Sequence, residues 1–116
     1  MAAFFVKGRK EPACLEEQVI MADIWNLLSS PAVMSGTQKP PGDVIMWNYQ
    51  LKDDQYTADP SWVKMQVISR WGRLPNDQTA FSNVVVIHYM FNLATRAFDQ
   101  MKFTNTPTQG CAKKTG

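Results

Sequence analysis

The segment from Phe81 to Met101 is the feature that most limits what this chain can fold into. Apolar residues occupy most of its positions and would leave almost no polar face in the middle of a helix. A helix that is apolar all round is buried on most of its sides. Because a chain of 116 residues can hardly cover such a helix alone, we expect residues 80–101 to form an interface in a homo-oligomer or a larger protein assembly.

The same segment leaves one alternative open. The run from Val84 to Ile87 consists of β-branched residues, which favour strands over helices. This run could therefore be a buried strand. Because the flanking residues have helical spacing, we predict a long helix that begins at Asn76 or Asp77 and continues to about Lys102.

Helical patterns also mark three earlier segments. Glu11-Pro12 is typical of a helix start, and the Ser-Ser-Pro sequence at 29–31 is typical of a helix end. A shorter helix is predicted after Asp43, and a third over residues 61–71, where apolar residues recur every fourth position. The predicted fold class is therefore all-α, a compact bundle of about four helices in a single domain over residues 1–103.

Residues 104–116 have no apolar pattern, and we expect them to form a flexible tail. The whole chain is 45% apolar and 19% charged, which indicates a folded domain. Its net charge of +2 is too small to indicate a nucleic-acid partner. The basic residues near the two ends are interpreted as solvated: Lys7, Arg9, Lys10, Lys113 and Lys114.

No segment has the pattern of a membrane span. The most apolar stretch, 81–98, is interrupted by several polar residues, including Asn83 and Arg96. The first six residues are apolar but too short for the core of a signal peptide. We therefore expect a cytoplasmic protein with no membrane partner and with reduced thiols.

The two cysteines, Cys14 and Cys111, match no zinc-binding spacing, and the sequence predicts neither a metal nor a cofactor. Cys14 would lie in the first turn of the first helix, where the helix dipole lowers the pKa of a thiol and favours the nucleophilic thiolate. The nearby Glu11 and Glu16 would raise that pKa again. The alternative is that Cys14 is a small buried apolar residue.

His88 is the single histidine of the chain and a candidate general base. It could equally be a packed side chain with one hydrogen-bond partner. Asn92 and Arg96 would share its helical stripe, either as a polar line across a subunit interface or as the lining of a pocket. The sequence leaves both readings open.

The stretch 44–103 contains the motif Phe91-Asn92-Leu93-Ala94-Thr95-Arg96, after a helix, a loop and a further helix in the predicted pattern. This half of the chain resembles the AhpD-like, or carboxymuconolactone decarboxylase-like, superfamily. The resemblance implies a helical fold and the chemistry of a thiol peroxidase, an antioxidant oxidoreductase. The superfamily carries a Glu-x-x-Cys-x-x-Cys-x-x-x-His motif at a helix start. If Cys14 is the peroxide-attacking cysteine, the other motif positions hold Gly8, Glu11 and Gln18 here.

The functional hypothesis is thus a peroxide-reducing thiol protein that has lost the dithiol motif. Its nucleophile would be Cys14, and Glu11, Glu17 or His88 would transfer protons. The alternative is a non-enzymatic structural or assembly subunit that uses helix 80–101 as its interface.

Overall fold

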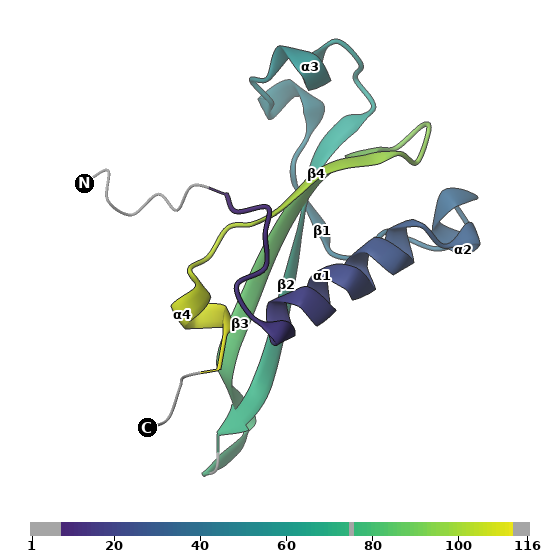
Figure 1. Cartoon of the computed structure of the whole chain (residues 1–116). Helices are drawn as coiled ribbons and strands as arrows, with labels where there is room; N and C mark the ends of the chain where they lie inside the picture. Colours follow the sequence, from purple (N-terminus) through teal and green to yellow (C-terminus); the bar gives the residue numbers. More distant parts are fainter. Residues whose placement is uncertain (1–7, 75, 113–116) are drawn as a thin grey trace.

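The computed structural model describes residues 8–74 and 76–112, and it shows one helix packed on a four-stranded antiparallel sheet. The strands lie side by side in chain order (Figure 1). The main elements are α1 (Leu15–Leu28), β1 (Asp43–Met46), β2 (Trp62–Leu74), β3 (Asp77–Asn92) and β4 (Phe98–Phe103). The short elements are α2 (Pro31–Met34), the 3-10 helix η2 (Asn48–Gln50), α3 (Asp54–Thr57) and α4 (Pro107–Gly110).

The first predicted helix is confirmed as α1, but it begins at Leu15, after the predicted start at Glu11-Pro12, so Cys14 precedes its first turn. Glu16 and Glu17 lie in its first turn, where the helix dipole favours negative charge. The helix ends at Leu28, and the next residues begin α2, whose first turn is capped by the hydroxyl of Ser30. Ile24 and Leu28 are buried against the sheet, and α1 lies across one face of it (Figure 1).

The predicted all-α bundle is wrong, because residues 61–71 and 80–101 form strands and not helices. Residues 62–74 are β2, whose buried residues include Val63 and Met65. A recurrence every fourth position also fits a strand, because positions four apart lie on the same side of a strand as well as of a helix.

Residues 80–101 contain most of β3, a hairpin turn and the start of β4. The β-branched run from Val84 to Ile87 belongs to β3, so the strand alternative is confirmed. Every second side chain from Val85 to Phe91 is at most 1% exposed and belongs to the core beside α1. The segment looked apolar all round because β3 also carries apolar residues on its other face. No helix 80–101 exists to serve as the predicted interface.

The second predicted helix is also replaced by other structure. Asp43 begins β1, and η2 and α3 follow before β2. Gly42 precedes β1 with a positive φ of 87°, and a Cβ at this position would overlap the backbone carbonyl of Gln66 on β2. This position therefore needs glycine both for its conformation and for the close approach of the two chain segments.

Residues 104–112 of the predicted tail pack against the sheet. The side chain of Asn105, 7% exposed, extends the β-ladder: its Nδ2 donates to the Val84 carbonyl (2.6 Å) and its Oδ1 accepts from the Val86 N–H (3.1 Å). The indole of Trp71 donates to the carbonyl of Gly110 (3.0 Å). Lys7, Pro75, Lys113 and Lys114 lie outside the described residues.

Candidate functional site

The two faces of the sheet are covered by different parts of the chain. The face that carries Val63 and Ile87 is packed against α1. Side chains alternate along a strand, so the residues at the alternate positions of each strand point to the other face. We call this other face the open face. In β2, β3 and β4 it carries Lys64, His88 and Lys102.

A cavity of about 380 Å³ lies on the open face. Its floor consists of Lys64, His88, Met90 and Lys102, from three neighbouring strands. Its walls come from residues 50–53 and Tyr56, in the connection between β1 and β2, and from Met46 and Gln100. We call this cavity the basic pocket. Figure 1 shows α3, which contains Tyr56, at the end of the sheet opposite to the β2–β3 turn.

Hydrogen bonds hold the wall of the basic pocket against the sheet. The buried Tyr56 donates its hydroxyl to a carboxylate oxygen of Asp99 on β4 (2.7 Å). Its ring meets the indole of Trp62 edge to face, with centroids 5.1 Å apart. The amide of Asn48 donates to the carbonyls of Tyr56 (3.1 Å) and Asp59 (2.9 Å). These contacts join η2, α3 and the start of β2 into one unit.

His88 stands between two lysines on the floor of the pocket. In the strand register His88 pairs directly with Lys102 on β4 and with Gln66 on β2. Lys64 lies two residues before Gln66, on the same side of β2. Burial, and then the charges of Lys64 and Lys102, lower the pKa of His88 to about 4. The imidazole is therefore neutral at pH 7. Its Nε2 lies 2.9 Å from the amide oxygen of Gln66, and a hydrogen bond between these atoms requires the tautomer with the proton on Nε2.

The two lysines of the floor carry charge without a partner. Within residues 8–74 and 76–112, neither Lys64 nor Lys102 makes a hydrogen bond or an ion pair through its ammonium group. Burial, and then the charge of Lys102, lower the pKa of Lys64. Asp53 supplies a carboxylate at the wall of the pocket, and Lys52 beside it adds a further ammonium. The pocket therefore has an excess of positive charge that an anion would neutralise.

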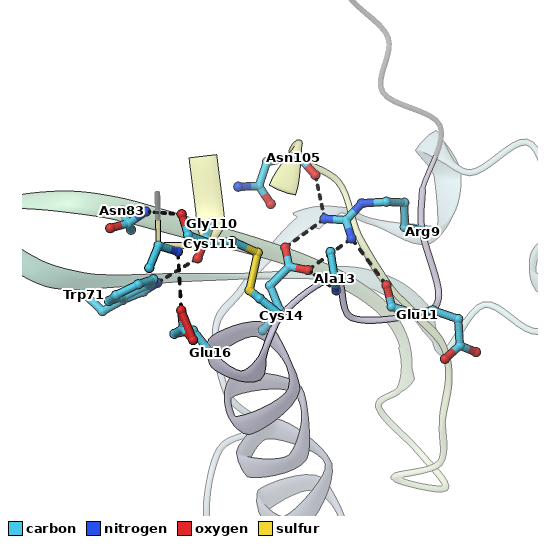
Figure 2. Close-up of a disulfide and its surroundings, with 12 residues drawn as sticks. Arg9, Glu11, Ala13, Cys14, Glu16, Trp71, Asn83, Asn105, Gly110 and Cys111 are labelled. Atoms are coloured by element: carbon cyan, nitrogen blue, oxygen red, sulfur yellow. Dashed lines mark hydrogen bonds and ion pairs between the residues drawn. A yellow bond between two sulfur atoms is a disulfide. The ribbon is translucent and has the colours of Figure 1, made fainter. Parts of the chain in front are cut away.

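Of the predicted catalytic residues, the structure brings Cys14 and Glu17 together, with Cys111 as a third member. Cys14 is joined to Cys111 in a disulfide, so the expectation of reduced thiols is corrected (Figure 2). The sequence spacing gave no hint of this pair because 97 positions separate the two cysteines. They meet because Cys14 precedes α1 and Cys111 follows α4.

Glu17 is fully buried beside the disulfide and is paired with Arg9. The guanidinium donates from Nη1 to Oε1 (3.1 Å) and from Nη2 to Oε2 (2.8 Å), and the Ala13 N–H donates to Oε1 (2.7 Å). Burial raises the pKa of Glu17, but the hydrogen bonds from Arg9 and Ala13 and the charge of Arg9 together lower it below its usual value. Arg9 also donates to the Asn105 carbonyl (3.1 Å), which ties the segment after β4 to the segment before α1 (Figure 2).

The other two predicted catalytic residues lie elsewhere. Glu11 is exposed, and its backbone carbonyl accepts a hydrogen bond from Arg9 (3.3 Å). His88 lies on the open face, whereas α1 and Cys14 at its start belong to the other side of the sheet. The four residues therefore do not form one site.

Asn92 is the last residue of β3 and Arg96 lies in the β3–β4 turn, so neither belongs to a helix. The side-chain oxygen of Asn92 accepts from the N–H groups of Ala94 and Thr95 (2.9 Å each). Arg96, with a φ of 66°, donates from Nε to the Val33 carbonyl (2.9 Å). Asn92 thus shapes the turn and Arg96 holds α2, and neither residue lines the basic pocket.

Comparisons with protein families, with curated proteins and with solved structures find no match to this chain. Among the described residues, no helix is both long and apolar enough to cross a membrane.

Proposed function

We propose that this protein binds a small amphiphilic anion in the basic pocket. The observation that carries the proposal is the pair Lys64 and Lys102, two ammonium groups without partners in the described residues, on the floor of one cavity. Charge-assisted hydrogen bonds to a carboxylate or phosphate would satisfy both groups. The neutral His88 between them adds no further positive charge at pH 7.

The remaining lining supports an apolar part of the ligand. Leu51 and Met90 face the pocket, and Met46 lies at its edge with 38% of its surface exposed. The cavity volume of about 380 Å³ lies at the small end of the range for small-molecule sites, which is roughly 300–1,000 Å³. An acid with a short alkyl or aromatic group fits these properties.

The test is calorimetric titration with octanoate and octyl phosphate, and with octanol as the neutral counterpart. We expect both anions to bind and octanol to bind much more weakly. Lys64→Met or Lys102→Met should each weaken anion binding about tenfold, because a hydrogen bond to a charged group contributes about 1.5–3 kcal/mol. Lys10→Met, at an exposed position outside the pocket, is the matched control and should bind as the native chain. Equal binding of octanol, or native affinity in both floor variants, would refute the proposal.

The thiol-dependent peroxide reaction stays a prediction, and the disulfide adds a condition to it. A nucleophilic thiolate at Cys14 would form only after the bond to Cys111 is reduced. Glu17 is then the carboxylate beside it, whereas His88 plays no part. Peroxide consumption by the reduced protein that is lost in Cys14→Ser would support this reaction. Equal peroxide consumption by the reduced native protein and by Cys14→Ser would rule out the thiol-dependent reaction.

Association with another chain also stays a prediction, and the exposed side of α1 now supports it. Leu15, Val19 and Trp25 are 67%, 49% and 53% exposed, an unusual set for the outer side of a surface helix. We expect light scattering to show an oligomer that dissociates in Leu15→Glu/Val19→Glu but not in the neighbouring control Gln18→Glu. A monomeric native chain would contradict this expectation.

A further inference from the structure

The disulfide and its buried neighbour form a compact group of metal-binding atoms. The sulfur atoms of Cys14 and Cys111 and a carboxylate oxygen of Glu17 all lie within 4.8 Å of one another. Cys14 is the extended residue directly before α1 and Glu17 lies in the first turn of the helix, so their side chains meet at the helix start. Cys111 reaches them from the end of α4 (Figure 2).

From this geometry we propose that the reduced protein binds one Zn²⁺ through Cys14, Cys111 and Glu17. Two thiolates and a carboxylate are ligands that zinc prefers, and a water molecule would complete a tetrahedron. The charges also balance, since Zn²⁺ and the guanidinium of Arg9 together offset two thiolates and one carboxylate. This proposal is independent of the basic pocket, which lies on the other face of the sheet.

The backbone is already placed for such a site. The two cysteine Cα atoms are 6.0 Å apart. With Zn–S bonds of about 2.3 Å, tetrahedral zinc separates its two sulfurs by roughly 4 Å. Rotation of the two short side chains can open this gap without moving α1 or α4.

Glu17 has an oxygen free for the metal. Its Oε2 accepts one hydrogen bond, from Arg9, and a second lone pair remains. This oxygen faces Gly110, where a Cβ would come within 3.1 Å of it. The missing side chain at Gly110 thus keeps the space between Glu17 and the neighbouring Cys111 open.

The chemistry balances with a dithiol as reductant. The reductant transfers two electrons and two protons to the disulfide, which yields two protein thiols and the cyclic disulfide of the reductant. Zinc then displaces the two thiol protons into solvent as the two Zn–S bonds form. Oxidation of the thiolates by a disulfide oxidant reverses the sequence and releases the ion. In both states the start of α1 stays joined to the end of α4, through a covalent bond or through the metal.

The experiment titrates the full chain with Co²⁺ after reduction by dithiothreitol and removal of the reductant under nitrogen, and then displaces the Co²⁺ with Zn²⁺. We expect one Co²⁺ per chain, with thiolate-to-cobalt charge-transfer absorption and the visible bands of tetrahedral cobalt. The oxidised chain should bind no Co²⁺ in this way. Glu17→Gln should weaken binding at least tenfold, as should Cys111→Ser.

Glu17→Gln removes both a metal ligand and the ion pair with Arg9. A second variant separates the effects of these two losses on metal binding. Arg9→Met removes the same ion pair but keeps all three ligands, and we expect it to bind Co²⁺ at least as tightly as the native chain. Glu11→Gln, nearby and exposed, should have no effect. The proposal is overturned if the reduced chain shows no thiolate charge transfer. It is equally overturned if Glu17→Gln binds as tightly as the native protein, or if Arg9→Met loses binding as fully as Glu17→Gln.

Discussion

At the scale of single residues, the environment of His88 gives the most direct report on the basic pocket. Burial, and then the charges of Lys64 and Lys102, place its pKa at about 4. Lys102→Met removes one of these charges, so protonation becomes easier and the pKa should rise, though not to 6.5, because burial remains. Titration of the imidazole signals by NMR measures this change. Lys10→Met is the control, and a native pKa near 6.5 would contradict the described environment.

The pH dependence of Glu17 has the same sign as that of His88, because the pKa of each group is lowered in the folded state. The folded-state pKa of Glu17 is lowered, so its stabilisation is complete above the unfolded-state pKa and is lost as the pH falls through the folded-state value. Glu17→Gln should lower the free energy of unfolding by about 2 kcal/mol at pH 7, because it leaves Arg9 half-buried without its carboxylate. As the pH falls below the unfolded-state value the difference should shrink, because the unfolded chain then binds a proton that the folded side chain binds more weakly.

Urea unfolding of the native chain and of Glu17→Gln at pH 7 and near pH 3 checks this prediction. Comparing the two proteins at each pH cancels the contribution of His88, which is common to both. A difference that stays constant from pH 7 to pH 3 would show that the ion pair with Arg9 does not stabilise the fold.

At the scale of elements, the disulfide joins α1 to α4 across nearly the whole chain. It closes a loop with a sequence separation of 97. A loop of this length reduces the entropy of the unfolded chain by an amount that corresponds to about 4–5 kcal/mol. The Cys14→Ala/Cys111→Ala variant should therefore unfold at a much lower urea concentration than the oxidised native chain. A reductant should destabilise the native chain and leave the variant unchanged; equal midpoints for the native chain and the variant would contradict the prediction.

The connection from η2 to α3 depends on Tyr56, whose hydroxyl bonds to Asp99. Tyr56→Phe should lower the free energy of unfolding by about 1 kcal/mol, because one buried hydrogen bond is lost. It should also weaken octanoate binding, since this connection is a wall of the basic pocket. Tyr49→Phe is the matched control, because Tyr49 is 85% exposed in η2. Calorimetric titration and urea unfolding of both variants measure the two effects, and equal behaviour of the two variants would refute the role of Tyr56.

Helix α1 was predictable from local sequence, whereas the sheet and the short helices α2, α3 and α4 were largely not. Early acidic residues and a stop at residues 29–31 identify α1 because each acts within one turn, whereas Pro12 placed the helix start three residues too early. In β2, the spacing of Val63, Val67 and Trp71 fits a helix and a strand equally well. Only the β-branched run from Val84 to Ile87 distinguished the two, and it was outweighed by its flanking residues.

At the scale of the whole molecule, the sheet separates two sites that sequence reasoning could not assemble. Lys64 and Lys102 meet because β2 and β4 flank β3, and Cys14 meets Cys111 because α1 and α4 approach the same end of the sheet (Figure 1). Neither pairing has a signal at short sequence separation. Cys14 and Glu17, three residues apart, could be proposed together from the sequence, and they do lie side by side.

The central claim, that the open face of the sheet binds an anion between Lys64 and Lys102, is tested most directly by an NMR titration of the native chain with octanoate. Amide and imidazole signals would be followed as the ligand is added. We predict that the largest shifts occur at Lys64, His88, Lys102 and residues 51–56, and that the pKa of His88 rises when the anion is bound. Shifts confined to the exposed side of α1, with the signals of His88 unchanged, would contradict the claim.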